Sequence, residues 1–198
     1  MPRKFLFAAA LGASLFAGSS LQAATVVNLD GVKNASLDGA NAVTLDLDAG
    51  VYSLDFVEGA YTAFTRFSNV SGCDGLGAKC VTGFENSARY VVNGLTVLFG
   101  DGAASGGLGP QATGGYYSTA SQSFAASNAF STTFSLAAPG SVSFYLFDDN
   151  LGDNSGGVSL SVAAVPEPTT WMFMLLGMAG IGYSMRRKEK QTLRVRFA

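Results

Sequence analysis

The feature that most constrains the fold is a two-residue period of apolar side chains over residues 43–56. The apolar members are Val43, Leu45, Leu47, Tyr52, Leu54 and Phe56, with mainly polar residues between them. Successive side chains of a strand point to opposite faces of a sheet, so this pattern predicts two strands with one buried face each. Asp48, Ala49 and Gly50 separate the two runs, and we expect a hairpin turn there with Gly50 at positive φ.

Similar short runs recur through the middle of the chain. We expect strands at residues 61–67, 88–99, 141–147 and 157–163, with a hairpin or bulge at Asn93 and Gly94. Phe124, Phe130 and Phe134 lie among Ser, Ala and Thr, as in sandwich strands, whereas residues 100–123 predict a long surface loop. This region contains no sustained helical period. The sequence therefore predicts an all-β fold, an antiparallel β-sandwich that is jelly-roll-like.

The first 23 residues have the composition of a secretory signal peptide. Arg3 and Lys4 form a basic start, residues 5–16 are apolar, and small or polar residues follow. We expect a signal helix that the Sec machinery exports and that signal peptidase removes after Ala23 or Ala24. A retained N-terminal anchor is the alternative, although its apolar run is shorter than the roughly 20 residues that span a bilayer. Residues 24–164 would then form the secreted β-sandwich domain.

Charged residues are distributed unevenly, which argues against some functions. Residues 24–164 contain 4 Lys and Arg residues against 12 Asp and Glu residues, a net charge of −8. Such an acidic domain repels phosphate backbones, so we expect no binding to nucleic acid. The chain has no His, which excludes His-dependent nucleophile triads and His-ligated metal sites. The sequence therefore indicates no catalytic residue.

A second apolar segment lies near the C-terminus. It is preceded by Val165, Pro166, Glu167 and Pro168 and followed by Arg186, Arg187 and Lys188. The prolines end the last strand because they lack an N–H donor and fix φ. Residues 171–185 are almost wholly apolar, so we expect a single transmembrane helix in residues 165–190 with its basic end in the cytoplasm. Residues 191–198 would form a cytoplasmic extension.

This tail resembles the PEP-CTERM sorting signal, which combines a Pro-Glu-Pro motif, a short Gly-containing apolar helix and an Arg-rich end. The resemblance implies recognition by an exosortase, a membrane-embedded cysteine transpeptidase that cuts near the motif and passes the protein to the cell surface. It also implies a link to bacteria that make extracellular polysaccharide, often as biofilm matrix. Pro166, Glu167 and Pro168 would be recognition residues, and Arg186 and Arg187 with Lys188 the stop signal. The inner membrane would hold the chain transiently; a plain single-pass anchor is the alternative.

The chain contains two cysteines, Cys73 and Cys80, in a polar, Gly-rich segment. In an oxidising compartment outside the cytoplasm, two cysteines at this short spacing predict a disulfide that closes a small loop. A redox-active pair is the alternative. It would require a thiol with a lowered pKa, which the neighbouring Asp74 disfavours.

An acidic stretch between two expected strands is the strongest candidate for a ligand site. Asp148, Asp149, Asp153 and Asn154 supply the hard oxygen atoms that Ca²⁺ prefers. The segment also resembles the calcium loop of bacterial galactose-binding lectins, which would imply sugar binding through Ca²⁺. The third interpretation is a plain turn, because Asp, Asn and Gly also favour turn geometry.

A second acidic group consists of Asp46, Asp48, Asp55 and Glu58. Paired carboxylates can hydrolyse glycosides only when they face each other across a groove, and alternation favours solvated strand positions instead. We therefore expect a non-enzymatic surface or matrix protein associated with exopolysaccharide. A Ca²⁺-dependent carbohydrate-binding module is the first alternative, and a secreted carboxylate-dependent hydrolase is the second.

Overall fold

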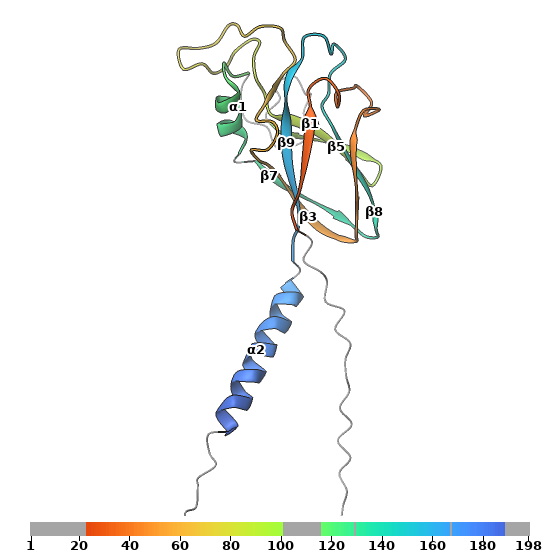
Figure 1. Cartoon of the computed structure of the whole chain (residues 1–198), viewed down its shortest axis with the longest axis vertical. Coiled ribbons are helices and arrows are strands. Elements are labelled where there is room, and N and C mark those ends of the chain that lie inside the picture. The colour runs from red at the N-terminus through yellow and green to blue at the C-terminus, as the bar shows by residue number, and fades with distance from the viewer. Residues whose placement is uncertain (1–22, 101–115, 129, 167, 189–198) are drawn as a thin grey trace, which may run out of the picture.

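The structure is a computed structural model that describes residues 23–100, 116–128, 130–166 and 168–188. Its body consists of two antiparallel sheets packed face to face, and a helix leaves one end of it (Figure 1). The expected all-β antiparallel architecture is confirmed, and its jelly-roll detail stays a prediction. The signal helix, Glu167 and the extension at residues 191–198 lie outside the described residues.

The strands divide between two sheets with the orders β1-β9-β3-β7 and β2-β8-β5-β6, and the short β4 also pairs with β9. In the first sheet the strands are β1 Thr25–Asp30, β3 Gly50–Phe56, β4 Phe64–Thr65, β7 Ser131–Leu136 and β9 Ser155–Ala164. In the second they are β2 Val43–Leu47, β5 Ser87–Val92, β6 Leu95–Gly100 and β8 Gly140–Tyr145. Thr25 of β1 faces Val162 of β9, so both ends of the body lie at one pole.

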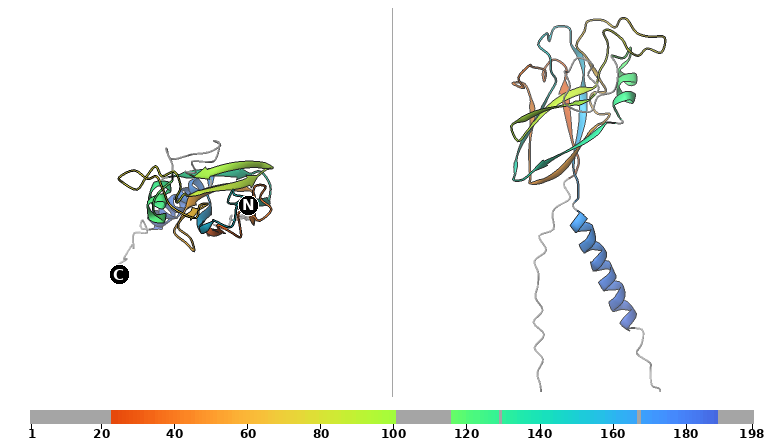
Figure 2. Two further views of the ribbon diagram at one scale, coloured as in Figure 1. Left: turned by 90° about the horizontal axis from the view of Figure 1, so that it is seen from above. Right: turned by 180° about the vertical axis from the view of Figure 1, so that it is seen from behind.

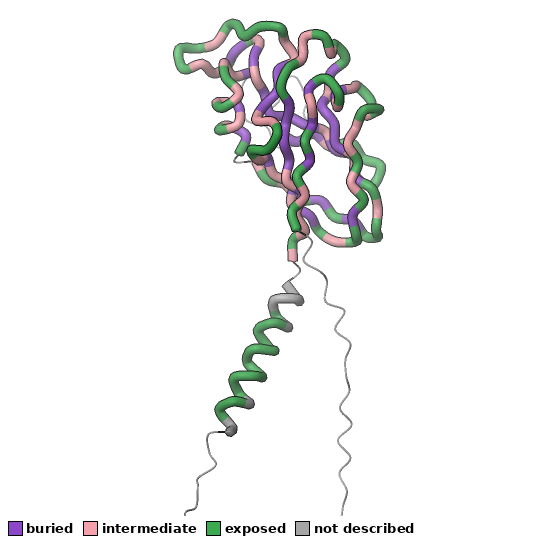
Figure 3. The backbone as a smooth tube through the Cα atoms, in the orientation of Figure 1, coloured by how far each residue is buried: buried purple, intermediate pink, exposed green. Residues whose placement is uncertain are grey.

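The two sheets bury one face each against the other, as the two-residue period predicts. Tyr52, Leu54 and Phe56 of β3 are buried, while the residues between them are partly exposed. Val142 and Phe144 of β8 join them in one core cluster from the opposite sheet. Figure 2 shows the layers from above, and Figure 3 shows that the buried residues lie in the body, whereas the described residues of the C-terminal helix are exposed.

The hairpin expected at residues 48–50 is wrong. β2 pairs with β8 in one sheet, and β3 pairs with β7 and β9 in the other. The chain crosses between the sheets here because Leu47 and Tyr52 both contribute to the shared core. Gly50 is the first residue of β3 and does not have a positive φ. Alternation fixes which face of a strand is buried, but it does not specify the partner strand.

Two expectations about the body are only partly right. The strand expected at residues 61–67 is reduced to β4, which pairs with the start of β9. Of the three phenylalanines expected in strands, Phe134 lies in β7, Phe130 lies just before it, and Phe124 lies in a helix, α1 (Ala120–Ser127). This helix also begins inside the predicted loop. Thr119 caps α1 by accepting the backbone N–H of Gln122. The helix is filled mainly by Ser and Ala, so it lacks the apolar stripe that would indicate it in the sequence.

The turn at Asn93 and Gly94 is confirmed as a hairpin between β5 and β6. Both residues have positive φ, 52° and 75°, as a type I′ turn requires. The strands expected at residues 141–147 and 157–163 correspond to β8 and β9, which belong to different sheets. The loop between them therefore connects the two layers.

Helix α2 (Pro168–Lys188) follows the body directly. It starts at a proline, whose missing N–H is tolerated in the first helical turn. Among the residues that the structure describes, no helix has both the length and the apolar character that crossing a membrane requires. The tail is thus helical as expected, and its transmembrane placement stays a prediction.

Candidate functional site: the C-terminal tail and the distal loops

The Pro-Glu-Pro motif lies at the junction between the sheet and α2. β9 ends at Ala164, and Val165 still donates its backbone N–H to the carbonyl oxygen of Val51 at 2.8 Å. Pro166 has no N–H to continue the ladder, and α2 begins at Pro168. The motif therefore starts where the sheet ends and finishes where the helix begins.

The described side chains of α2 are predominantly apolar and exposed. Those more than half exposed are Met172, Met174, Leu175, Leu176, Met178, Ile181, Tyr183 and Met185. A helix that is apolar around its circumference is usual where lipid or protein, rather than water, surrounds it. The exposed Arg186 then ends the apolar run. The described part of the tail therefore presents an apolar surface that ends at Arg186.

Residues 164–188 match the family model of the PEP-CTERM protein-sorting motif. The chain carries a PEP-CTERM sorting motif. The match spans the junction and α2, so the resemblance seen in the sequence is confirmed. The PEP-CTERM motif implies that the protein is exported, processed by an exosortase and sorted to the cell surface. No curated protein and no solved structure matches the chain.

The predicted disulfide between Cys73 and Cys80 is present. It closes a loop at the end of the body opposite α2 (Figure 1). Asp74 accepts the backbone N–H groups of Ala78 and Leu76, each at 2.9 Å, and these bonds lower the pKa of the Asp74 carboxyl. An anionic neighbour disfavours a thiolate. The surroundings are therefore typical of a structural disulfide.

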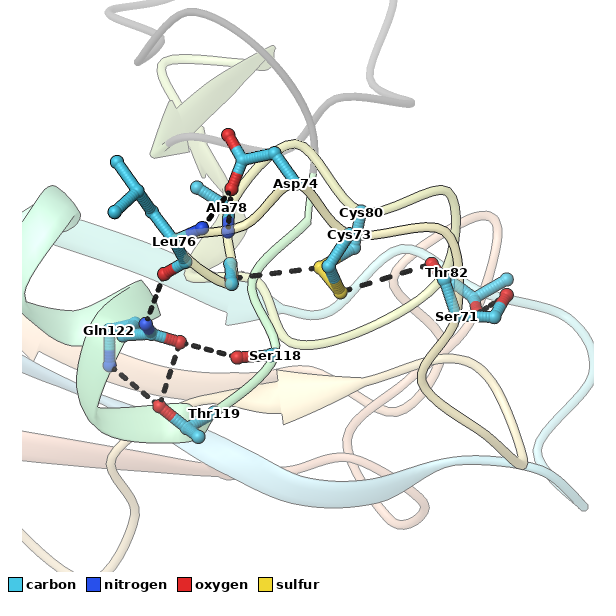
Figure 4. Close-up of a disulfide and its surroundings, with 11 residues drawn as sticks. Ser71, Cys73, Asp74, Leu76, Ala78, Cys80, Thr82, Ser118, Thr119 and Gln122 are labelled. Carbon is cyan, nitrogen blue, oxygen red and sulfur yellow. Dashed lines mark hydrogen bonds between the residues drawn. A yellow bond between two sulfur atoms is a disulfide. The ribbon is translucent and has the colours of Figure 1, made fainter.

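Replacing both cysteines with Ser should lower the free energy of unfolding by about 2 to 3 kcal/mol, because the unfolded chain loses a short cross-link. The folded loop should keep its place, since Gln122 of α1 donates to the carbonyl oxygen of Leu76 at 2.9 Å (Figure 4). Urea unfolding of the exported protein without reductant measures the difference. Dithiothreitol should destabilise the wild type to the same extent and leave the variant unchanged; an equal response in both would contradict the prediction.

The acidic loop between β8 and β9 lies at the same distal end as the disulfide (Figure 1). Asp148 is buried, with 8% of its surface exposed, whereas Asp149 is exposed and Asp153 and Asn154 are half-buried. Asn154 donates its side-chain amide to the carbonyl oxygen of Gly31 at 2.8 Å. The four residues that the sequence indicated therefore have different surroundings, with Asp149 facing solvent.

Three side-chain oxygens of this loop are buried without a hydrogen-bond partner: Asp148 Oδ2, Asp153 Oδ1 and Asn154 Oδ1. Burying an oxygen acceptor without a partner costs free energy, so such atoms usually bind something. Within the described residues, no three His, Cys, Asp or Glu side chains form a group that could hold a metal. A cation in this loop would therefore need carboxamide or backbone carbonyl oxygens among its ligands.

The second acidic group is divided between the two sheets. Asp46 of β2 accepts a hydrogen bond from Ser141 at 2.5 Å and lines a shallow pocket with Asp48. Asp55 belongs to β3 in the other sheet, where it faces Ser131 of β7 and Ser161 of β9. Asp46 and Asp48 therefore share one pocket, whereas Asp55 lies in the other sheet, away from them.

A buried ion pair was not indicated by the sequence. Arg66 donates through Nε to Oε1 of Glu85 at 2.7 Å, and its Nη2 lies 2.6 Å from the same oxygen. Ser87 donates to the other carboxylate oxygen at 3.1 Å. Glu85 is only 1% exposed, and this burial raises its pKa, while Arg66 opposes the rise. Burial, with the nearby Glu85 charge, also raises the pKa of Tyr116 to about 12.

Such a pair leaves little trace in a sequence, because an isolated Arg and an isolated Glu are usually found at the surface. The available signal is that Glu85 and Asn86 directly precede the apolar run of β5. Polar residues at that position also suit the end of an exposed strand.

Proposed function

We propose that this protein is a non-enzymatic surface protein that an exosortase delivers to an exopolysaccharide matrix. The observation that carries the proposal is the PEP-CTERM match over residues 164–188, which begins where the last strand ends. Cleavage near the Pro-Glu-Pro motif would leave β9 and its neighbours intact, because the body makes its sheet hydrogen bonds up to Val165.

Before cleavage, α2 would hold the exported chain at the inner membrane. Its exposed apolar side chains would contact lipid, and Arg186 at its end would reach the headgroup region on the cytoplasmic side. The short apolar run of residues 171–185 can be accommodated by local thinning of the bilayer and by basic side chains that extend to its surface. The same helix would present the motif to the membrane-embedded exosortase.

Association with polysaccharide is supported by polar residues on the outer face of one sheet, beside the exposed Val26 and Val51. On the sheet that contains β9, the outward positions include Asn28, Ser53, Asp55, Thr133 and Ser135. Hydroxyl, carboxamide and carboxylate groups can all exchange hydrogen bonds with sugar hydroxyls. The net negative charge of the body would keep it soluble in a hydrated matrix.

Replacing Pro166, Glu167 and Pro168 together with Ala should abolish C-terminal processing, because it removes the recognition residues. The full chain is expressed with its cognate exosortase, and the mature protein is analysed by intact mass. The wild type should end near the motif, whereas the variant should retain its tail. Replacing Thr169 and Thr170 with Ala changes adjacent positions of α2 and should leave processing unchanged.

An unprocessed tail in the wild type would contradict the sorting role and leave a plain membrane-anchored β domain. Fractionation of the same cultures tests the matrix role separately. Processed protein should be retained in the exopolymer. Its complete release into the medium would overturn the association with polysaccharide while leaving the sorting role intact.

A further inference from the structure

We propose that the β8–β9 loop binds a Ca²⁺ ion through Asp148, Asp153 and Asn154, against the loop that follows β1. This site does not depend on the sorting tail, which leaves the body at the opposite end (Figure 1).

The first argument is the concentration of unpartnered oxygens. Asp148 Oδ2, Asp153 Oδ1 and Asn154 Oδ1 are all buried and accept no hydrogen bond, and all belong to one seven-residue stretch, 148–154. In a plain turn that binds no ligand, these side chains could point into water without any loss of free energy. Carboxylate and carboxamide oxygens of this kind are the ligands that a hard cation prefers.

The second argument is charge. Asp148 is 92% buried, and none of the described cationic side chains forms an ion pair with it. Arg66 lies close enough to interact with Asp148, but its guanidinium binds Glu85 directly. Asp148 and Glu85 therefore share the charge of Arg66, while the guanidinium of Arg89 lies over the ring of Phe147. A buried carboxylate without a compensating cation is unfavourable, and a bound Ca²⁺ would supply the missing charge.

The third argument is that the loop is held in place from the β1 side. Asn154 donates its amide to the carbonyl oxygen of Gly31 at 2.8 Å, which fixes the orientation of its own Oδ1. Gly31 in turn donates its backbone N–H to the carbonyl oxygen of Gly156 at 2.9 Å. These two bonds position one ligand before any ion binds, which reduces the entropy cost of binding.

The donor set favours Ca²⁺ over other metals. It consists of oxygen atoms only, which disfavours Zn²⁺ and Cu²⁺ because those ions prefer nitrogen and sulfur. The set has two carboxylates and one carboxamide, so backbone carbonyls and water would complete the six to eight ligands that Ca²⁺ accepts. With so few charged ligands, we expect a dissociation constant on the order of 10⁻⁴ to 10⁻³ M, the range of extracellular calcium modules.

The structure also separates Asp149 from the other acidic residues. Asp149 is exposed and has no unpartnered buried oxygen. It therefore provides a matched control, since Asp149→Asn removes one charge from the same loop without removing a ligand. Asp153→Asn removes a ligand charge at nearly constant volume.

The test is thermal unfolding of the exported full-length chain in 5 mM CaCl₂, in 5 mM MgCl₂ and in EDTA. Calcium should raise the melting temperature of the wild type by about 3 °C over EDTA, and magnesium by clearly less. Asp149→Asn should respond as the wild type does, and Asp153→Asn should lose the response. Asn154→Ala keeps both carboxylates and should weaken the response to Ca²⁺. This variant replaces Asp153→Asn in the test if Asp153→Asn does not fold.

Isothermal titration with Ca²⁺ provides the second readout, with one site expected in the wild type and in Asp149→Asn. The proposal is overturned if the wild type binds no Ca²⁺ at 5 mM. It is also overturned if Asp149→Asn loses the response as fully as Asp153→Asn does, because that pattern indicates screening of the acidic loop by any divalent cation.

Discussion

The Arg66→Met variant should be less stable than the wild type by about 3 to 5 kcal/mol at pH 8. Met retains most of the apolar bulk of Arg but removes the guanidinium that binds Glu85 at 2.6 to 2.7 Å. Glu85 is 1% exposed and keeps only the hydrogen bond from Ser87. The variant therefore leaves a buried carboxylate without a countercharge, which is among the costliest single changes in a folded protein.

The loss should depend on pH in a defined direction. Burial raises the folded-state pKa of Glu85 above its ordinary value of 4.5, and Arg66 opposes that rise. A raised pKa stabilises the folded state below pH 4.5, and this stability is lost as the pH rises through the folded-state value. Removing Arg66 raises the folded-state pKa further. The difference between variant and wild type should therefore grow from pH 4 to pH 8.

Urea unfolding of the exported protein at both pH values measures this effect. The double variant Arg66→Met, Glu85→Leu removes both charges and should recover most of the stability at pH 8. If Arg66→Met alone were as stable as the wild type at pH 8, Glu85 would have to be solvated, contrary to its burial.

The Phe144→Ala variant should lose about 3 to 5 kcal/mol of unfolding free energy, with little dependence on pH. Phe144 of β8 is fully buried, and its ring lies 6.3 Å from that of Tyr90 on the neighbouring β5. Its removal leaves a cavity between the sheets, because a packed core relaxes only partly into the vacated space. Urea unfolding again gives the difference.

The matched control for this core substitution is Leu95→Ala, at the β5–β6 hairpin in the same sheet. Leu95 is 68% exposed, so its truncation should change stability by less than about 0.5 kcal/mol. Equal losses in the two variants would contradict the arrangement of the core.

Features that depend on neighbouring residues could be predicted from the sequence. The alternation around Leu54 indicated the buried face of β3, the Asn93–Gly94 pair indicated the β5–β6 hairpin, and Cys73 and Cys80 were close enough to predict their bridge. The sorting tail was also recognisable, because its motif, apolar segment and basic end follow one another within about 25 residues.

Features that depend on distant residues could not be predicted. Leu47 and Tyr52 are close in sequence, but their strands lie in different sheets. The strand of Leu47, β2, pairs with β8, whereas the strand of Tyr52, β3, pairs with β7 and β9. The chain changes sheet here because closing the core requires it. Likewise, the Arg66–Glu85 pair and the contact between Asn154 and Gly31 join separate loops. The sequence indicated the oxygen donors near Asp148 but not that Asp149 would be separated from them by exposure.

The position of β9 determines how the body would respond to mechanical force. β9 is flanked by β1 and β3, both antiparallel to it, and the chain leaves the body from its end. A protein attached through this end and pulled from its distal loops would be loaded along β9. Antiparallel hydrogen bonds run perpendicular to the strands, so the bonds on both sides of β9 would resist shear together instead of opening one after another.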